Sequence, residues 1–170
     1  MTDVLKLIQS RRSIRKYADA PVDDKQVEAL LRAAMSAPSA GNEQPWEFVV
    51  IRDEATRAKV VEFHAHAKPV VAAALGILVC GDMNRVKYDE MWVQDCSAAV
   101  ENLLIAARGI GLGTCWLGIY PREERMKGMA ELCKLPDNVA PFALIAVGVP
   151  DENKGLADYY DVERVHHETF

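Results

Sequence analysis

The sequence predicts a single domain, spanning residues 1–170, in which helices pack on a central sheet as an α/β or α+β sandwich. Three observations support this fold class. A chain of 170 residues with 50% hydrophobic and 26% charged residues has the size and composition of one globular domain. Short apolar runs alternate along the chain with helical patterns. No repeat, low-complexity segment or linker interrupts this alternation.

The first half of the chain alternates helix and strand patterns. Apolar residues in helical register predict a short helix over residues 3–10. A clearer amphipathic helix over 24–35 follows an aspartate that can cap it, and its apolar residues recur every three to four positions. The β-branched run at 48–51 predicts a buried strand. A third helix over 53–64 can begin at a capping aspartate, and the apolar stretch that follows ends in a second predicted strand at 75–80.

The second half contains the longest helical pattern, from about residue 89 to 108. Small and apolar residues lie on most of its sides, which predicts a helix buried on most sides. The glycine-rich segment 109–113 follows this helix and precedes a strand or extended segment at 114–119. A dinucleotide-binding loop needs the opposite order of strand, glycines and helix, so these glycines are interpreted as a helix cap at positive φ. A helix over 121–133 and a strand over 142–149 complete the pattern.

Charge and hydropathy limit the classes of partner. The formal net charge of -5 and the pI near 5.4 argue against a nucleic-acid surface. The sequence has no apolar run long enough to span a membrane and no basic start followed by an apolar leader. We therefore expect a cytoplasmic protein. The polar tail 151–170 carries apolar side chains that need a surface to bury them, and we expect it to wrap a partner subunit.

The four cysteines lie 16 to 19 residues apart, without a CxxC pair, in apolar or helical segments. This usage is typical of buried free thiols in a reducing compartment. No histidine combines with cysteine or aspartate at a familiar ligand spacing, so no metal site is expected. The sequence also lacks GxSxG and HExxH motifs, which leaves hydrolytic mechanisms little support.

A basic cluster, RRSIRKY at residues 11–17, places four cations within six residues just after the first helix. Such a cluster can be a solvated turn that benefits from the negative end of the helix dipole. It can also be an anion site, because arginine offers a planar fork that matches phosphate oxygens and Ser13 adds a hydroxyl donor. A bound phosphate would offset the mutual repulsion of the cations.

The loop PSAGNEQPW at residues 38–46 is longer and more elaborate than a helix-to-strand connection requires. Taken together, RRSIRKY, this loop with its flanks, DCSAAVENLLIAARGIGLGTCWLGIYP and the ERVHHETF tail resemble the FMN-dependent nitroreductase family. The resemblance covers nearly the whole chain in the right order. It implies an α+β fold with a mixed, mainly antiparallel central sheet, an intertwined homodimer, and one FMN at each dimer interface.

The resemblance also implies roles for particular residues. Arg11, Arg12 and Ser13 correspond to phosphate and ribityl contacts, and Arg15 to the basic residue near N1 and O2 of the flavin ring. Many relatives have a further cation in the tail, where this chain has Tyr159, so either Lys154 or Arg164 is expected to supply that charge. The remaining predicted contacts are the loop that reaches the partner's flavin, Pro38, Ser39, Ala40, Asn42 and Gln44; the β-segment that can donate an N–H to N5, Trp116, Leu117 and Gly118; and His66 at the pyrimidine end.

The function implied by the resemblance is reduction of nitroaromatic, quinone or similar conjugated acceptors by NAD(P)H, through FMN, in a ping-pong cycle. No side-chain acid or base is obligatory in such a cycle, because the cofactor carries the redox chemistry. The alternative is a non-catalytic flavin-binding or flavin-delivery protein. A dehalogenating or flavin-destroying relative is a further alternative. The segment 83–92 is expected to face the acceptor or to pack in the dimer.

Overall fold

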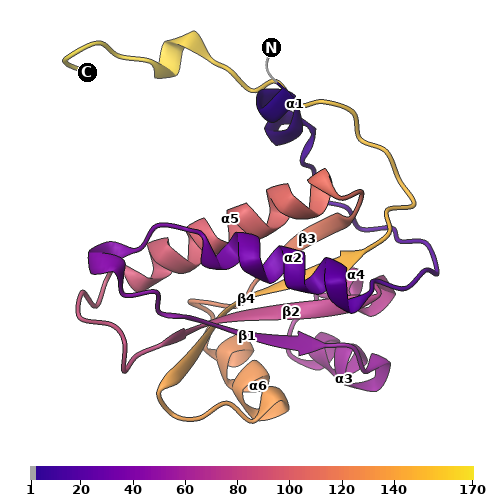
Figure 1. Cartoon of the computed structure of the whole chain (residues 1–170). Helices are drawn as coiled ribbons and strands as arrows, with labels where there is room; N and C mark the ends of the chain where they lie inside the picture. Colours follow the sequence, from indigo (N-terminus) through magenta and orange to yellow (C-terminus); the bar gives the residue numbers. More distant parts are fainter. Residues whose placement is uncertain (1–2) are drawn as a thin grey trace.

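The computed structural model, which describes residues 3–170, consists of an antiparallel sheet between two layers of helices (Figure 1). The strands follow the spatial order β1-β2-β4-β3, and every neighbouring pair is antiparallel. Among the described residues the parallel component is limited to an isolated bridge between Ser13 and Thr114. The predicted fold class is confirmed. The strands are β1 (Trp46–Ile51), β2 (Leu75–Asp82), β3 (Gly113–Gly118) and β4 (Val139–Gly148).

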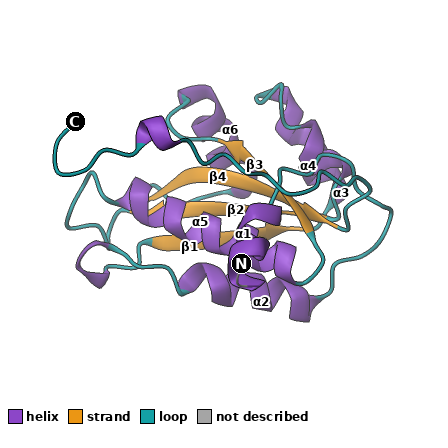
Figure 2. Ribbon diagram, turned by 90° about the horizontal axis from the view of Figure 1, so that it is seen from above, coloured by secondary structure: helices purple, strands orange, loops and turns teal. Residues whose placement is uncertain are grey.

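Helices cover both faces of the sheet, as the view from above also shows (Figure 2). On one face, α2 (Asp24–Met35) and α5 (Trp92–Gly109) pack on residues such as Ile77 of β2. The other face carries α3 (Glu54–Lys59), a 3-10 turn (Val60–Glu62), α4 (Lys68–Ala72) and α6 (Glu123–Cys133), which bury the alternate strand residues. Because successive side chains of a strand point to opposite faces, each strand contributes to both cores.

Local signals explain where the helices begin and end. Asp23 and Gln26 form a capping box at the start of α2, and the Asp53 side chain caps α3 through the Thr56 N–H. Gly111, at φ +82°, turns the chain out of α5 towards β3, and the next N–H, from Leu112, donates to Ala107 O at 2.8 Å. This confirms that the glycine-rich segment is a helix terminus.

The structure shifts several predicted boundaries. The third helix ends at Lys59 and continues as a 3-10 turn, and α5 begins at Trp92 rather than near residue 89. The residues before Trp92 form a loop whose Lys87 N–H donates to the Glu43 carboxylate at 3.0 Å. Helix α4 is absent from the predicted elements because its five residues are too few to establish a helical period.

The two ends of the described chain lie on the surface. Helix α1 (Asp3–Ser10) has no buried residue, and Val4 and Ile8 are exposed. After β4 the tail runs past α1 and away from the sheet, with one 3-10 turn, Val162–Arg164 (Figure 1). It leaves several large apolar side chains exposed, namely Leu156, Tyr159, Tyr160, Val162, Val165 and Phe170. None of the helices within residues 3–170 is both long and apolar enough to cross a bilayer.

Candidate functional site at the edge of the sheet

The cations of the N-terminal cluster and one tail lysine line a common hollow of about 250 Å³. Its lining consists of Arg11, Arg12, Ser13, Arg15, Lys154 and Tyr159. Lys154 is thus the tail cation that joins the predicted phosphate contacts. Arg164, the other candidate, has a side chain that is 84% exposed and pairs with Asp161 at 3.1 Å, so within one chain it does not approach the hollow.

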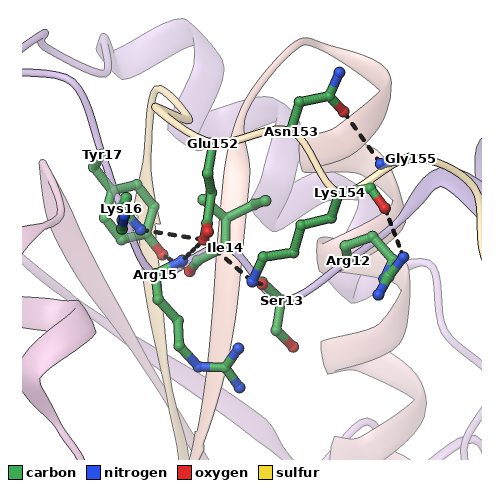
Figure 3. Close-up of polar contacts among 10 residues, drawn as sticks. All are labelled: Arg12, Ser13, Ile14, Arg15, Lys16, Tyr17, Glu152, Asn153, Lys154 and Gly155. Carbon is green, nitrogen blue, oxygen red and sulfur yellow. Dashed lines mark hydrogen bonds and ion pairs between the residues drawn. The ribbon is translucent and has the colours of Figure 1, made fainter.

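The tail fixes this hollow by hydrogen bonds to the backbone (Figure 3). Arg12 Nη1 donates to Lys154 O at 2.7 Å, and Lys154 Nζ donates to Ser13 O at 2.6 Å. The Glu152 carboxylate accepts the Arg15 N–H at 2.6 Å and also pairs with Lys154 at 3.2 Å. Hydrogen bonding from the Arg15 backbone, and then from Lys154, lowers the pKa of Glu152.

The hollow carries more positive than negative charge. Arg11 pairs with Glu101 at 3.2 Å, and Lys154 pairs with Glu152. Within residues 3–170, no carboxylate forms an ion pair with Arg12 or Arg15. The Arg15 guanidinium points away from Glu152 (Figure 3). An anion with several oxygens would complete this set of donors.

A second hollow adjoins the first, because Arg15 lines both. This hollow, of about 650 Å³, is lined by Arg15, Ala65, His66, Lys68, Pro69 and Ala72. The structure therefore places His66 and Arg15, two of the predicted cofactor contacts, in the lining of one hollow. The small apolar residues give the hollow a surface on which a flat ring can lie, and the cations surround it.

The free edge of β3 lies beside the same cations. The Arg12–Ile14 segment follows this edge, because Ser13 bridges Thr114 and the Ile14 N–H donates to Thr114 O at 2.8 Å. Alternate residues of an antiparallel strand direct their backbone groups to the same side. Trp116 and Gly118 therefore direct their N–H groups outward, away from β4.

The same alternation turns the Leu117 N–H away from the free edge. Ile119 N donates to Phe142 O at 3.2 Å, so Leu117, two residues earlier, also directs its N–H towards β4. Among the residues predicted to offer an N–H to N5, Gly118 thus has its N–H on the free edge and Leu117 does not. The Leu117 side chain is buried, and Trp116 packs edge-on against Phe142 at 5.8 Å between ring centroids.

The loop Pro38–Gln44 is held in an unusual conformation. Gly41, Asn42 and Gln44 all have φ near +50°, between 50° and 56°. Left-handed backbone at a residue other than glycine costs free energy, and such positions concentrate at functional sites. Hydrogen bonds within the loop support it: Gln44 N donates to Ser39 Oγ, and Gln44 Nε2 donates to Asn42 Oδ1, each at 3.0 Å.

This loop is attached to the first turn of α5 through Asp95. The Ala40 N–H donates to Asp95 Oδ1 at 3.0 Å, and the residue is 5% exposed. The second carboxylate oxygen, Oδ2, is buried without a hydrogen-bond partner among the described residues, as is Oε2 of Glu43. A hollow of about 290 Å³ lies over this site, lined by Pro38, Ser39, Ala40, Met91, Gln94, Asp95 and Ala98.

The loop is held near the start of α5, whereas the cations lie beside its middle, where Arg11 pairs with Glu101, and its C-terminal end. Arg108, near the C-terminal end of the helix, donates to Ser10 Oγ at 3.0 Å, whereas Asp95 holds the loop. Thirteen residues of α-helix separate Asp95 from Arg108, about 20 Å at 1.5 Å per residue. In one chain the loop and the cations therefore line separate hollows.

Sequence reasoning missed two residues of these regions, Asp95 and Glu152. A charged residue beside the buried Cys96 in a helix that is apolar on most sides was a usable signal for Asp95. No local pattern marks Glu152, because its partners come from a segment more than 130 residues away.

The cysteines are free thiols, as predicted. Burial raises the pKa of all four, that of Cys96 to about 12. Reactive thiolates are therefore disfavoured at these positions. Among residues 3–170 no group of histidine, cysteine and acidic side chains is arranged to hold a metal ion.

Comparison with known proteins identifies the family of the chain. The profile of the nitroreductase family matches residues 8–92 and 67–149. The chain belongs to the nitroreductase family. A protein of Archaeoglobus fulgidus, provisionally named NADH dehydrogenase/NAD(P)H nitroreductase, is 46% identical over 172 residues, 99% of each chain.

Two solved structures extend this family relationship. A protein of Parabacteroides distasonis with the same provisional name has a TM-score of 0.95 and 35% identity, and covers 100% of both chains. A provisionally assigned nitroreductase of Desulfovibrio desulfuricans, solved in complex with FMN, has a TM-score of 0.86 and 33% identity. The match covers 100% of this chain and 99% of that one. The family prediction is thus confirmed.

Proposed function

We propose that the protein is an FMN-dependent NAD(P)H oxidoreductase that reduces nitroaromatic, quinone or similar conjugated acceptors. The observation that carries this proposal is the grouping of a cation hollow, an outward N–H and a flat-floored hollow. The cation hollow borders β3 where Ser13 bridges Thr114, Gly118 directs its N–H from the same edge, and Arg15 joins the cation hollow to the flat-floored one. The solved relative from Desulfovibrio desulfuricans, which holds FMN, supports the choice of cofactor.

The donor set of the cation hollow fits a phosphate monoester. Arg12 and Lys154 are partly buried, and each donates to the backbone of the opposite segment, which fixes both side chains. Ser13 adds a hydroxyl. Four cations and a hydroxyl suit a dianionic group, because guanidinium and ammonium donors form charge-assisted hydrogen bonds to its oxygens.

The ring of the cofactor would occupy the hollow between Arg15 and His66. When bound there, FMN supplies the two-electron chemistry between NAD(P)H and the acceptor. The Gly118 N–H would hold N5, and Arg15 would stabilise negative charge at N1 and O2 as a preorganised electrostatic group. Since the same hollow would admit the nicotinamide and then the acceptor, we infer a ping-pong order.

A homodimer would complete this site. The loop 38–44 is attached near the start of α5 through Asp95 and does not line the cation hollow, so we infer that a second copy supplies the loop if both contact one cofactor. The exposed apolar side chains of α1 and of the tail give each chain the surface that such an interface needs. The tail, residues 151–170, would then lie on the partner.

The test is an absorbance spectrum of the purified protein, followed by anaerobic titration with NADH and with NADPH. We expect a yellow homodimer that a nicotinamide bleaches and that a quinone or nitroarene restores. A yellow protein that neither nicotinamide bleaches would be a flavin-binding or flavin-delivery protein, which contradicts the enzymatic proposal. A colourless monomer that does not respond to added FMN would overturn it altogether.

A further inference from the structure

We propose that Arg125 is the positioning residue of the Gly118 N–H, the group that the proposed function assigns to N5 of the cofactor. The inference rests on that proposed function. It adds a residue of α6 that lies outside the cation hollow and outside the loop. Arg125 acts through the Gly118 peptide carbonyl, which it holds on the free edge of β3.

The contact itself is short and well placed. Arg125 Nη1 donates to Gly118 O at 2.8 Å. Gly118 is the last residue of β3, and beyond it the N–H groups of Ile119 and Tyr120 both donate to Phe142 O. The outward side of Gly118 therefore has no strand partner, and a Cβ built there would meet no atom within 4 Å. The guanidinium is the group that fixes this otherwise free end of the strand.

Helix physics alone does not explain an arginine at this position. Arg125 is the third residue of α6, where the positive end of the helix dipole disfavours a cation. The first two residues, Glu123 and Glu124, have the charge that the helix end favours. The hydrogen bond to Gly118 O stabilises Arg125 at a position where the helix does not. Such a charge-assisted hydrogen bond is stronger than one between neutral groups.

Strand geometry carries the effect from the carbonyl to the N–H. Both backbone groups of Gly118 point to the same side of β3, so the guanidinium stands beside the position where an acceptor for the N–H would lie. Arg125 can thus set the direction of the N–H and also contribute positive charge next to the ring. Either effect is preorganised, since the hydrogen bond exists before any ligand arrives.

A buried histidine, His64, lies near the Gly118 carbonyl. The His64 ring is 3% exposed and lies against Arg125 and His66, with ring centroids of the two histidines 6.4 Å apart. Burial, then Arg125, then His66 lower the pKa of His64; the Gly118 backbone opposes this shift, although neither ring nitrogen reaches hydrogen-bonding geometry. His64 therefore stays uncharged near neutral pH, and Arg125 is the cation at this carbonyl.

The experiment compares Arg125→Met and Arg125→Lys with the parent, and uses Arg122→Met as the matched control. Arg122 is exposed and caps α6 without a side-chain hydrogen bond, so its removal changes charge at the same helix end but not the β3 contact. Three readouts are taken: the carbonyl ¹³C shift of Gly118 in flavin-free protein, the ¹⁵N shift of N5 in bound labelled FMN, and the rate of anaerobic flavin reduction.

We expect Arg125→Met to move both chemical shifts and to slow reduction by about tenfold, the lower end of the effects of supporting residues in other sites. FMN affinity should stay within about threefold, because the phosphate donors are untouched. Arg125→Lys keeps the positive charge and a donor, so it should show a smaller change than Arg125→Met in both chemical shifts and in the rate. If Arg125→Met does not fold, Arg125→Lys provides the test in its place. Arg122→Met should match the parent.

Two outcomes would overturn the inference. One is an unchanged N5 shift and reduction rate in a folded Arg125→Met variant whose Gly118 carbonyl shift has moved. The other is an equal change in the Arg122→Met control. If instead the parent itself binds no FMN, the proposed function fails, and this result is distinguishable because it appears before any substitution is made.

Discussion

The two ends of α5 differ in the kind of group that they leave unsatisfied. At the cation end, defined by Arg11, Arg12, Arg15 and Lys154, guanidinium groups outnumber carboxylates. At the loop end, defined by Pro38–Gln44 and Asp95, buried carboxylate oxygens lack donors among the described residues. A buried acceptor without a partner costs about 1–3 kcal/mol, so the loop end is not in its most favourable state in a single chain.

The difference teaches how one short chain can build a cofactor site. Each end is rigid by itself, since the cation end is fixed by hydrogen bonds to the tail and the loop end by strained, internally bonded backbone. Neither end encloses a ligand alone. A two-fold axis that pairs the cation end of one copy with the loop end of another would use both without any lengthening of the chain.

The largest expected effect concerns the cation end. Lys154→Met should raise the FMN dissociation constant by about 10–100-fold, the equivalent of about 1.5–3 kcal/mol for one hydrogen bond to a charged group. Fluorescence titration of the flavin-free protein measures this. Arg164→Met is the matched control and should change affinity little, because Arg164 pairs with Asp161 on the surface. Equal losses in both variants would show that the tail cations are not distinguished as the structure indicates.

A smaller effect is expected at the loop end. Asp95→Ala should lower the free energy of unfolding by about 1–2 kcal/mol, because the Ala40 N–H loses its acceptor and the first turn of α5 loses a favourable charge. Asp95→Asn keeps an acceptor for the Ala40 N–H and should lose about half as much or less. Urea unfolding of both variants measures the difference.

The outcome at Asp95 also tests the complementarity of the two ends. If Oδ2 receives a donor from a second copy, Asp95→Asn should weaken the dimer even though the Ala40 bond remains, which sedimentation at several protein concentrations would detect. A dimer of parental strength in Asp95→Asn would mean that the loop end is complete in one chain and does not need a donor from a second copy.

The smallest effect concerns pH. Because the pKa of His64 is lowered in the folded protein, the unfolded state binds a proton first as the pH falls below about 6.5. Stability should therefore decline from that pH downward until the folded-state pKa is passed. His64→Phe should reduce this decline, and His167→Phe in the exposed tail should leave it unchanged. Urea unfolding between pH 8 and pH 5 measures it.

Carboxyl groups change the free energy of unfolding at lower pH than His64 does, so the two contributions can be separated. Hydrogen bonds from Thr56 lower the pKa of Asp53, and those from the Arg15 backbone and Lys154 lower that of Glu152. Their stabilisation is lost as the pH falls through values below about 4. A decline above pH 5 that persists in His64→Phe would contradict the assignment to His64.

Most of the fold could be predicted because its local signals agree with its packing. The period of residues 24–35 and the capping aspartates identified α2 and α3, and the helix-glycine-strand order excluded a dinucleotide loop. Helix α4 could not be predicted, since a five-residue helix with a proline in its first turn has no measurable period. The loop before Trp92 is held by the contact of Lys87 with Glu43, a tertiary feature that no local pattern in the sequence marks.

The candidate site could be predicted where its residues are adjacent in the sequence. It could not be predicted where the fold brings distant residues together. The basic run at 11–17 was conspicuous, and the structure adds Lys154 to it from the tail. The choice between Lys154 and Arg164 depends on which side chain the folded tail brings to the hollow. The choice between the N–H groups of Leu117 and Gly118 depends on which of them points away from β4. Arg125 and Asp95 act through backbone atoms of other segments, for which no local spacing exists.

The open edge of β3 has a consequence for the protein without its ligand. An unpaired strand edge can recruit a strand from another molecule, and full-length edges of this kind are usually capped by charge, proline or a covering segment. Between Thr114 and Gly118 this chain would rely on a small molecule for that cover. We expect protein made under vitamin B2 starvation to associate through β3, so that cofactor supply governs not only turnover of substrate but also how much protein stays in solution.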